Sequence, residues 1–358
     1  MGGRHDRESA SPALRSGGGD VLSDVLRAGK LTGALFFLVD AAPPWKVAVP
    51  DARTFAPIIL PHAQHVISYH VVTRGACSGA LIGGPPVALA AGDILVFPHG
   101  DPYVISSAPI GDEEVDFHSS VAFFRLMAAG DLPFTVTEGG TGAERLQLTC
   151  GFLGCDARPF NPLLQTLPRM LHVRAPSAPE GDLLARLIEL TLAESRADRP
   201  GGECIRLRLS ELLFIEVVRR HLTSIPEAQA GWLAGLKDPA IGRALALLHQ
   251  RPAHAWSLDE LAGSVGMSRS ALAERFSGFV GQPPMQYLGQ WRMQIAARLL
   301  ADGASKVAAV ALEVGYGSEA AFSRAFKKAT GVSPADWRRR PARLRHLIGK
   351  SKRSRVVQ

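Results

Sequence analysis

A pattern of about 20 residues occurs twice near the C-terminal end of the chain, at residues 257–276 and again at residues 307–326. In each copy an alanine lies four residues before a glycine, and a serine just after the glycine precedes an apolar stripe. The alanine lets two helices cross closely, the glycine permits a sharp turn, and the serine caps the second helix. The pattern therefore predicts two helix-turn-helix units, a motif that places its second helix in the major groove of DNA. These positions are Ala262, Gly266, Ser268, Leu272 and Phe276 in the first copy, and Ala311, Gly315, Ser318, Phe322 and Phe326 in the second.

Charge is distributed unevenly along the chain. Residues 237–358 contain 20 Lys and Arg against 8 Asp and Glu, a net charge of +12, whereas the first 236 residues carry −5. A basic half joined to a mildly acidic half is typical of a polyanion-binding module attached to another domain. Part of the excess lies in a basic tail at residues 341–358, and such a tail alone is more often solvated than a specific reader of sequence.

Length and composition set further bounds. A chain of 358 residues has room for two or three domains. It has no run of 18 apolar residues, so we expect no membrane span. Residues 1–20 are rich in Gly, Ser and charge and are expected to be disordered rather than a signal peptide. The four cysteines are too few and too scattered for a disulfide framework, which favours a reducing cytoplasm.

The N-terminal half has the texture of a β-rich domain. Residues 21–28 have helical spacing, and from residue 33 to about 136 short apolar runs are broken by Gly, Pro and Asp. Many short strands at regular spacing indicate a β-sandwich or barrel. The expected strands are Leu35–Val39, Ala56–Leu60, His65–Val72, Cys77–Ile82, Val87–Leu89, Ile94–Phe97 and Tyr103–Ser106, with Leu146–Phe152 as a late addition.

From residue 161 onward the pattern becomes helical. Asn161 and Pro162 open one helix, and Leu183–Glu194 and Cys204–Leu222 are expected to form two longer ones. Cys204–Leu222 is apolar over a broad arc, so it is either sandwiched inside the domain or buried against a second copy of the chain. Residues 231–239 are expected to be a linker, and the basic half beyond it contains seven expected helices.

Four stretches of the basic half closely resemble the AraC/XylS family of bacterial transcription regulators. They are Gly281–Leu288, Trp291–Leu300, Gly315–Lys327 and Gly331–Arg338. The resemblance covers residues 237–340 and implies two helix-turn-helix units joined by a rigid linker helix, which read successive major-groove segments. It also implies double-stranded DNA as a partner, with RNA polymerase and a second copy of the chain as further candidates.

The N-terminal half resembles the cupin-type sensor domains fused to a subgroup of that family. Its Gly92–Tyr103 stretch is similar to the second cupin motif, but Tyr103 stands where the motif has a metal-binding His. Near the first motif only His70 is present, and Arg74 stands near the position of the acid. The resemblance therefore implies a barrel without the enzymatic metal site, so we expect no metal and no cofactor. It places a small-molecule effector near His70 and Tyr103.

The expected architecture is thus α+β and multidomain. It comprises a cupin-like β-barrel over residues 21–160, a helical connector and candidate dimerisation region over residues 161–230, and an all-α DNA-binding domain over residues 237–340.

The resemblance also gives candidate DNA contacts. Base contacts in the family come from positions that match Ser270, Ala273 and Glu274 in the first unit and Ala320, Ser323 and Arg324 in the second. Arg324 is the strongest candidate because a guanidinium pairs bidentately with guanine; its alternative is a phosphate contact or a solvated side chain. The candidate phosphate contacts are Arg269, Arg275, Arg292, Lys327 and Lys328.

Two other functional classes stay open at this point. One is a cupin enzyme that uses an accessory DNA-binding domain, and the other is a DNA binder with a vestigial barrel. A metal- or redox-responsive regulator is a further alternative, because His62, His65, His70 and His99 form a loose cluster and Cys150 and Cys155 lie close in sequence. The chain has no nucleophile-elbow, zinc-protease or P-loop motif, so we expect a regulator and not an enzyme. The effector, the operator and the choice between activation and repression are not specified by the sequence.

Overall fold

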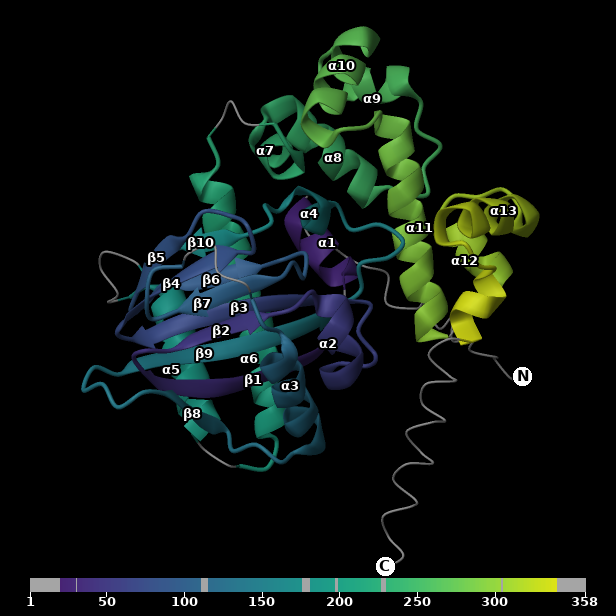
Figure 1. Ribbon diagram of the computed structural model, residues 1–358. Coiled ribbons are helices and arrows are strands. Elements are labelled where there is room, and N and C mark those ends of the chain that lie inside the picture. Colours follow the sequence, from purple (N-terminus) through teal and green to yellow (C-terminus); the bar gives the residue numbers. More distant parts are fainter. Residues whose placement is uncertain are drawn as a thin grey trace, which may run out of the picture.

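The computed structural model describes residues 20–29, 31–110, 115–175, 181–196, 199–226, 230–303 and 305–339. A two-sheet β domain lies on one side, and a group of helices built from the C-terminal half stands against it (Figure 1). No helix in the described ranges is long and apolar enough to cross a lipid bilayer.

The β domain is a sandwich of two sheets, which is the cupin architecture, and not a closed barrel. The larger sheet has six strands in the order β10-β6-β3-β9-β1-β8, antiparallel except for the parallel pair of β1 and β8. The smaller sheet has four strands in the order β2-β7-β4-β5. Their bounds are β1 Leu31–Ala42, β2 Lys46–Val49, β3 His65–Arg74, β4 Ala76–Leu81, β5 Val87–Ala90, β6 Ile94–Phe97, β7 Tyr103–Ser106, β8 Thr135–Gly139, β9 Leu146–Cys155 and β10 Leu171–Val173.

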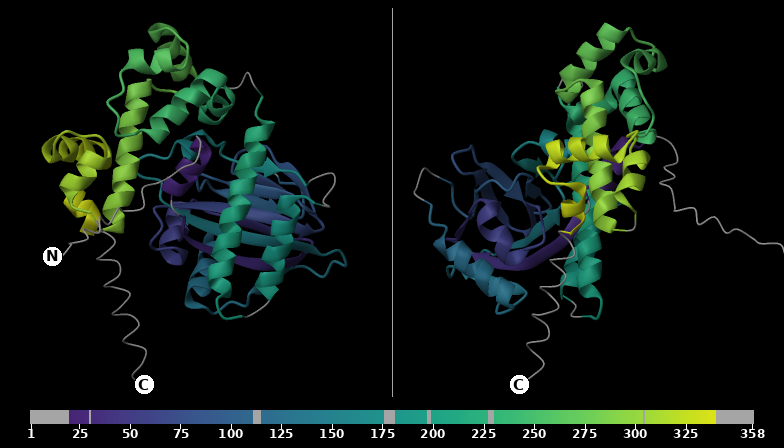
Figure 2. Two further views of the ribbon diagram at one scale, coloured as in Figure 1. Left: turned by 180° about the vertical axis from the view of Figure 1, so that it is seen from behind. Right: turned by 90° about the vertical axis from the view of Figure 1, so that its right-hand side faces the viewer.

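The larger sheet is buried on both faces. Along β3 the side chains alternate, as the two-residue period of a strand requires. Val66 and Val72 enter the core between the sheets, whereas Ile67 and Tyr69 belong to a second hydrophobic cluster on the outer face. Two long helices, α5 (Leu183–Arg196) and α6 (Gly202–Ser224), cover that outer face (Figure 2, left). The strand is therefore buried along nearly its whole length, as expected of a sheet between two layers.

Four shorter helices complete the N-terminal half: α1 (Val21–Ala28), α2 (Ala52–Ile59), α3 (His118–Ala129) and α4 (Pro162–Thr166). The prediction of a strand at Ala56–Leu60 is wrong, because most of this run lies in α2. Asp51 caps that helix by accepting the Arg53 N–H at 2.9 Å, and the buried residues Ala52, Phe55 and Ile59 lie on one helical face. A short, unbroken apolar run does not by itself distinguish a strand from a buried helix.

The prediction of a linker at residues 231–239 is also wrong. Residues Trp232–Lys237 form helix α7, and Trp232 is 1% exposed. The indole N–H of Trp232 donates to the Tyr287 hydroxyl at 2.9 Å, which ties α7 to the long helix α11. The packed C-terminal helices therefore begin at about residue 231, earlier than the pattern suggested.

The seven helices expected beyond that point are all present. They are α8 Pro239–Gln250, α9 Leu258–Ser264, α10 Arg269–Val280, α11 Pro284–Asp302, α12 Val307–Glu313, α13 Glu319–Thr330 and a last helix at residues 334–339. Helices α9 and α10 make the first helix-turn-helix unit, and α12 and α13 make the second. In Figure 1 the second unit lies on the side of α11 that faces away from the sandwich.

Candidate nucleic-acid interface and ligand cavity

The first helix-turn-helix unit has the geometry that its sequence pattern predicts. Ala262 is buried in the crossing of the two helices, and Gly266 has a positive φ of 72° in the turn. Ser268 caps α10 by accepting the N–H of Ala271 at 3.3 Å. The apolar stripe of α10, Leu272 and Phe276, is fully buried, so the opposite face is presented to solvent.

The second unit repeats this geometry with a tighter turn. Ala311 is fully buried, and Ser318 caps α13 through the Ala321 N–H at 3.2 Å. Gly315 has a φ of 83°, and a Cβ at this position would lie 2.6 Å from the carbonyl oxygen of Ala253. The turn of the second unit therefore packs directly on the loop that joins α8 to α9. Its glycine is required both by the backbone conformation and by the close approach.

The candidate base-reading residues lie on the accessible faces of the two recognition helices. Ser270 and Glu274 in α10 are exposed, as are Ala320 and Arg324 in α13. Ala273 and Ser323 are half-buried at the edge of the same faces. Each helix thus presents its three predicted positions on the side opposite its core stripe.

The candidate phosphate contacts fall into two groups. In the first unit Arg275 forms an ion pair with Asp238 at 2.5 Å, and Arg269 lies 3.6 Å from Asp259. In the second unit Lys327 and Lys328 are exposed, and neither contacts a carboxylate within the described residues. The cationic side chains of the first unit are therefore partly neutralised by acids of the same domain, whereas those of the second unit remain available to a polyanion.

The prediction for Arg292 needs a correction, because its side chain forms hydrogen bonds inside the protein. Its guanidinium donates to the carbonyl oxygens of Pro252 at 2.7 Å and His254 at 2.8 Å, and the side chain is half-buried. Burial lowers the pKa of this guanidinium from its usual value. Arg292 thus fixes the loop between α8 and α9 to α11, and the prediction that it contacts phosphate is not supported.

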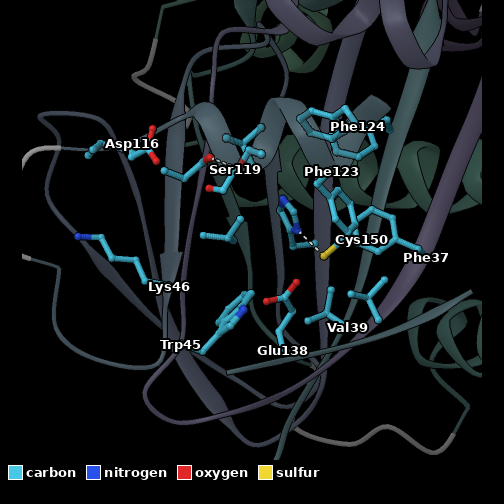
Figure 3. A pocket seen from close by; sticks show the side chains of 18 residues that line it. Phe37, Val39, Trp45, Lys46, Asp116, Ser119, Phe123, Phe124, Glu138 and Cys150 are labelled. Atoms are coloured by element: carbon cyan, nitrogen blue, oxygen red, sulfur yellow. Dashed lines mark hydrogen bonds between the residues drawn. The ribbon is translucent and has the colours of Figure 1, made fainter. Parts of the chain in front are cut away.

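The N-terminal half contains a cavity of about 350 Å³ between the two sheets and α3. Its lining is largely aromatic and aliphatic, as is usual for a small-molecule site. Figure 3 shows Phe37, Phe123 and Phe124 on one side and Trp45 on another. The residues that line it are Phe37, Val39, Trp45, Lys46, Val47, Ala48, Val49, His70, Val115, Asp116, Ser119, Ser120, Phe123, Phe124, Val136, Glu138, Cys150 and Phe152.

His70 and Tyr103, the two cupin-motif positions, do come together. The His70 Nε2 atom lies 2.7 Å from the Tyr103 hydroxyl, and the His70 Nδ1 atom lies 3.1 Å from the Cys150 sulfur. Burial lowers the pKa of His70 to about 3, so the ring is neutral, and burial raises the pKa of the Cys150 thiol. His70 lines the cavity, but Tyr103 does not. Tyr103 is fully buried behind it and stacked on Phe97 at 3.8 Å, which corrects its assignment to the effector pocket.

Two other histidines of the loose cluster, His65 and His99, bond elsewhere. The imidazole of His65 contacts the carbonyl oxygen of Pro98, and that of His99 contacts the carbonyl oxygen of Leu167. Within the described ranges no three His, Cys, Asp or Glu side chains are grouped as metal ligands would be. Cys155 is buried and its thiol pKa is raised to about 12 by burial, which disfavours the reactive thiolate.

Comparison with known proteins agrees with both halves of this description. The family described as "Cupin" matches residues 20–223, and the one described as "Helix-turn-helix domain" matches residues 261–340. An AraC-like transcription regulator of Streptomyces antibioticus is 35% identical over 281 residues, which cover 78% of this chain and 89% of that protein. The chain belongs to the AraC-like transcription regulators.

Another relative is the HTH-type transcriptional regulator AlkR of Acinetobacter baylyi, which is 29% identical over 77% of this chain and 89% of its own length. The solved structure of fatty acid-bound ToxT from Vibrio cholerae covers 86% of this chain and 95% of its own, with 12% identity and a low TM-score of 0.31. Like its AraC-like relatives, this chain is a transcription regulator with a cupin-type N-terminal domain and an AraC-type DNA-binding domain.

Sequence reasoning missed the aromatic cavity lining and the contacts between the two halves. Trp45 and Phe123 lie in segments for which no element was expected, although Phe123 and Phe124 sit in α3, a stretch of helix-forming residues without breakers. The buried hydrogen bonds that Gln294 makes to Phe160 and Ala28, and the approach of Asp24 to His249, left no signal in the pattern, because a polar residue on a helix is normally expected to be solvent-exposed.

Proposed function

We propose that this AraC-like regulator reads a specific DNA site with α10 and α13, and that a small molecule in the cupin cavity sets how firmly its first helix-turn-helix unit is held. One observation carries this proposal. A single cluster of buried hydrophobic residues runs from the outer face of the large sheet through α6, α1 and α4 into α7, α8, α10 and the first half of α11. Because the two share this cluster, a rearrangement of its residues on the sheet side would also alter the packing of the first helix-turn-helix unit.

Polar contacts reinforce the connection between the halves. The Gln294 side chain, which is 3% exposed, accepts the N–H of Phe160 at 3.1 Å and donates to the carbonyl oxygen of Ala28 at 3.0 Å. Asp24 of α1 lies 3.8 Å from the Nδ1 atom of His249 in α8. The Asp24–His249 distance exceeds hydrogen-bond length, so it is the two buried hydrogen bonds of Gln294 that help to fix one relative position of the packed elements.

At His70, only strand β3 separates the cavity from the hydrophobic cluster that the two halves share. His70 faces the cavity, and its neighbour Tyr69 projects from the other face of the sheet. The Tyr69 hydroxyl lies 3.1 Å from the Ser210 hydroxyl of α6, and both residues are buried. A ligand that binds one arrangement of β3 more tightly than another would shift the population of α6 positions.

Helix α6 also bears on assembly. Its apolar arc is only partly used inside the chain: Leu213 and Val217 are buried, whereas Ile205 and Leu212 are each 47% exposed. Leu183 and Leu190 of the adjacent α5 are 48% and 55% exposed. We propose that a second copy of the chain covers this surface, since paired half-sites are common in bacterial operators. Replacing Leu212 with Lys is then expected to yield a soluble monomer by sedimentation analysis, and a monomeric wild type would contradict the dimer.

Catalysis is not part of the proposal. The polar groups deepest in the cavity bond to one another, because both ring nitrogens of His70 are engaged by Tyr103 and Cys150. The remaining partners that we propose are double-stranded DNA, a small-molecule effector and RNA polymerase, in the cytoplasm.

Selection of bound duplexes from a random DNA library tests the proposal. The full chain should enrich one sequence with two conserved segments about one helical turn apart, because two recognition helices enter successive major-groove segments. Enrichment of no sequence, with binding that depends only on salt, would reduce the protein to a non-specific DNA binder.

A further inference from the structure

The shape and lining of the cavity restrict what it binds. Its volume of about 350 Å³ is at the lower end of small-molecule sites. Phe37, Phe123, Phe124 and Phe152 form a connected set of ring contacts, with centroid distances from 5.1 to 6.4 Å between neighbours. Such a lining favours a compact ligand whose body is mostly apolar and carries a ring or a short hydrocarbon chain.

The polar side chains deepest in the cavity, those of His70 and Ser120, are already bonded within the protein. His70 contacts Tyr103 and Cys150, and the Ser120 hydroxyl donates to the carbonyl oxygen of Ala48 at 2.5 Å. A polar group on the ligand would have to break one of these bonds to gain a partner there. Discrimination among ligands therefore falls to the charged residues at the edge of the lining.

Among the described residues, three charged side chains line the cavity, and together they carry one net negative charge. They are Lys46, Asp116 and Glu138. Asp116 accepts the backbone N–H of His118 at 2.8 Å, so its carboxylate is partly engaged. Glu138, at the end of β8, has no hydrogen-bonding or ionic partner among the described residues. Figure 3 shows its carboxylate projecting into the cavity, while Lys46 and Asp116 lie nearer one edge.

We propose that the cavity binds a small organic cation, in which an apolar body lies against the phenylalanine rings and an amine or quaternary ammonium group lies near Glu138 and Trp45. A cation is attracted by a carboxylate and by the face of an indole ring, and both attractions strengthen when the ligand displaces water from the cavity. This inference rests on the proposed sensor function and specifies its ligand class.

Titration calorimetry on the full chain with three probes that share one body tests the ligand class. The probes are phenylbutylamine, phenylbutanol and phenylbutyrate, which are cationic, neutral and anionic at neutral pH. The amine is expected to bind about 10-fold more tightly than the alcohol, and the carboxylate more weakly than both. Glu138→Gln should reduce amine affinity about 10-fold and leave the affinity of the alcohol unchanged.

Glu144→Gln is the matched control, because Glu144 is exposed, carries the same charge and lies outside the cavity lining. It should leave all three affinities unchanged. Tighter binding of the carboxylate, or equal binding of all three probes in both variants, would overturn the cation assignment while leaving the sensor function intact. If none of the three probes binds to folded protein, the cation assignment and the cavity's role as a sensor both fail, but selection of a specific DNA site would still support the regulator.

Discussion

The two helix-turn-helix units share one sequence pattern but differ in what holds them. The first unit has no core of its own, since its buried residues belong to the cluster that reaches into the sensor half. The second unit has a separate core, formed with the last turns of α11 and the helix at residues 334–339. The first unit is therefore placed to respond to the sensor, and the second to act as an independently folded DNA-binding unit.

The two units also differ in how far acidic residues neutralise their cationic side chains. Arg269 and Arg275 of the first unit are paired with acids, whereas Arg324, Lys327 and Lys328 of the second have no carboxylate partner in the described structure. Long-range attraction to phosphate thus falls mainly to the second unit. The two copies of one motif thus differ in what their buried helix faces pack against: the first packs into the cluster shared with the N-terminal domain, and the second packs into a core of its own.

The largest expected effect comes from truncating the tryptophan in each core. Trp232→Ala and Trp337→Ala should each cost about 3–5 kcal/mol, since both indoles are buried and hydrogen-bonded. Trp232→Ala should lower the melting temperature of the sensor together with the first unit, because they share a core. Trp337→Ala should destabilise the second unit alone. Calorimetric scans of both variants separate these outcomes, and an equal shift of the sensor in both would contradict the division.

The turn glycines offer a smaller contrast. Gly315→Ala should cost about 3 kcal/mol, since it combines a positive φ with a steric overlap on the backbone of Ala253. Gly266→Ala should cost only about 1 kcal/mol, because its turn has the same sign of φ but open space around it. Urea unfolding of the two variants measures both values. Equal costs would mean that the turn of the second unit does not pack on the loop before α9.

DNA contacts follow next in size. Arg324→Ala should weaken binding to the selected site by about 1–3 kcal/mol and relax preference at one base pair. Lys328→Ala should weaken binding to selected and random DNA alike and reduce the salt slope by about 1. Arg269→Ala, at a candidate phosphate contact of the first unit, should have a smaller effect because Asp259 lies 3.6 Å away. Binding titrations at several salt concentrations test the order, and a larger loss from Arg269→Ala would reverse it.

The smallest effect concerns pH. Burial lowers the pKa of His249 from 6.5 to about 3 in the folded state, so the unfolded chain binds the proton first as pH falls. Its contribution to stability is complete above pH 6.5 and is lost progressively below it, by about 1 kcal/mol between pH 6.5 and 5.5. His249→Phe should remove this part of the pH dependence. His254→Phe is the control, since His254 is accessible, and a flat profile for it alone would contradict the assignment.

An element of this fold could be predicted from the sequence where its residues have a conformational requirement that few other residue types meet. The two units were predictable because Ala262, Gly266 and Ser268 each have a geometric task that few other residues perform. Helix α2 was mistaken for a strand because Pro57 and an unbroken apolar run concealed its helical face. Helix α7 was missed because a six-residue helix with an internal glycine has almost no periodicity.

The DNA-contacting faces could be predicted from the sequence more fully than the cavity, for similar reasons. The recognition faces of α10 and α13 follow from helical spacing once the core stripe is known. His70 was found through a cupin motif, but Phe37, Phe123 and Glu138 meet only when β1, α3 and β8 are assembled. The internal task of Arg292 was equally unpredictable, because an exposed arginine and one that bonds to two loop carbonyls look the same in sequence.

Hydrogen exchange on the full chain and on a fragment that begins at residue 230 tests the central claim most directly. Removing the sensor half should strongly accelerate exchange in α8 and α10, which lose part of their core, and leave exchange in α12 and α13 nearly unchanged. Equal acceleration in both units, or none in either, would contradict the claim that only the first unit shares its core with the sensor.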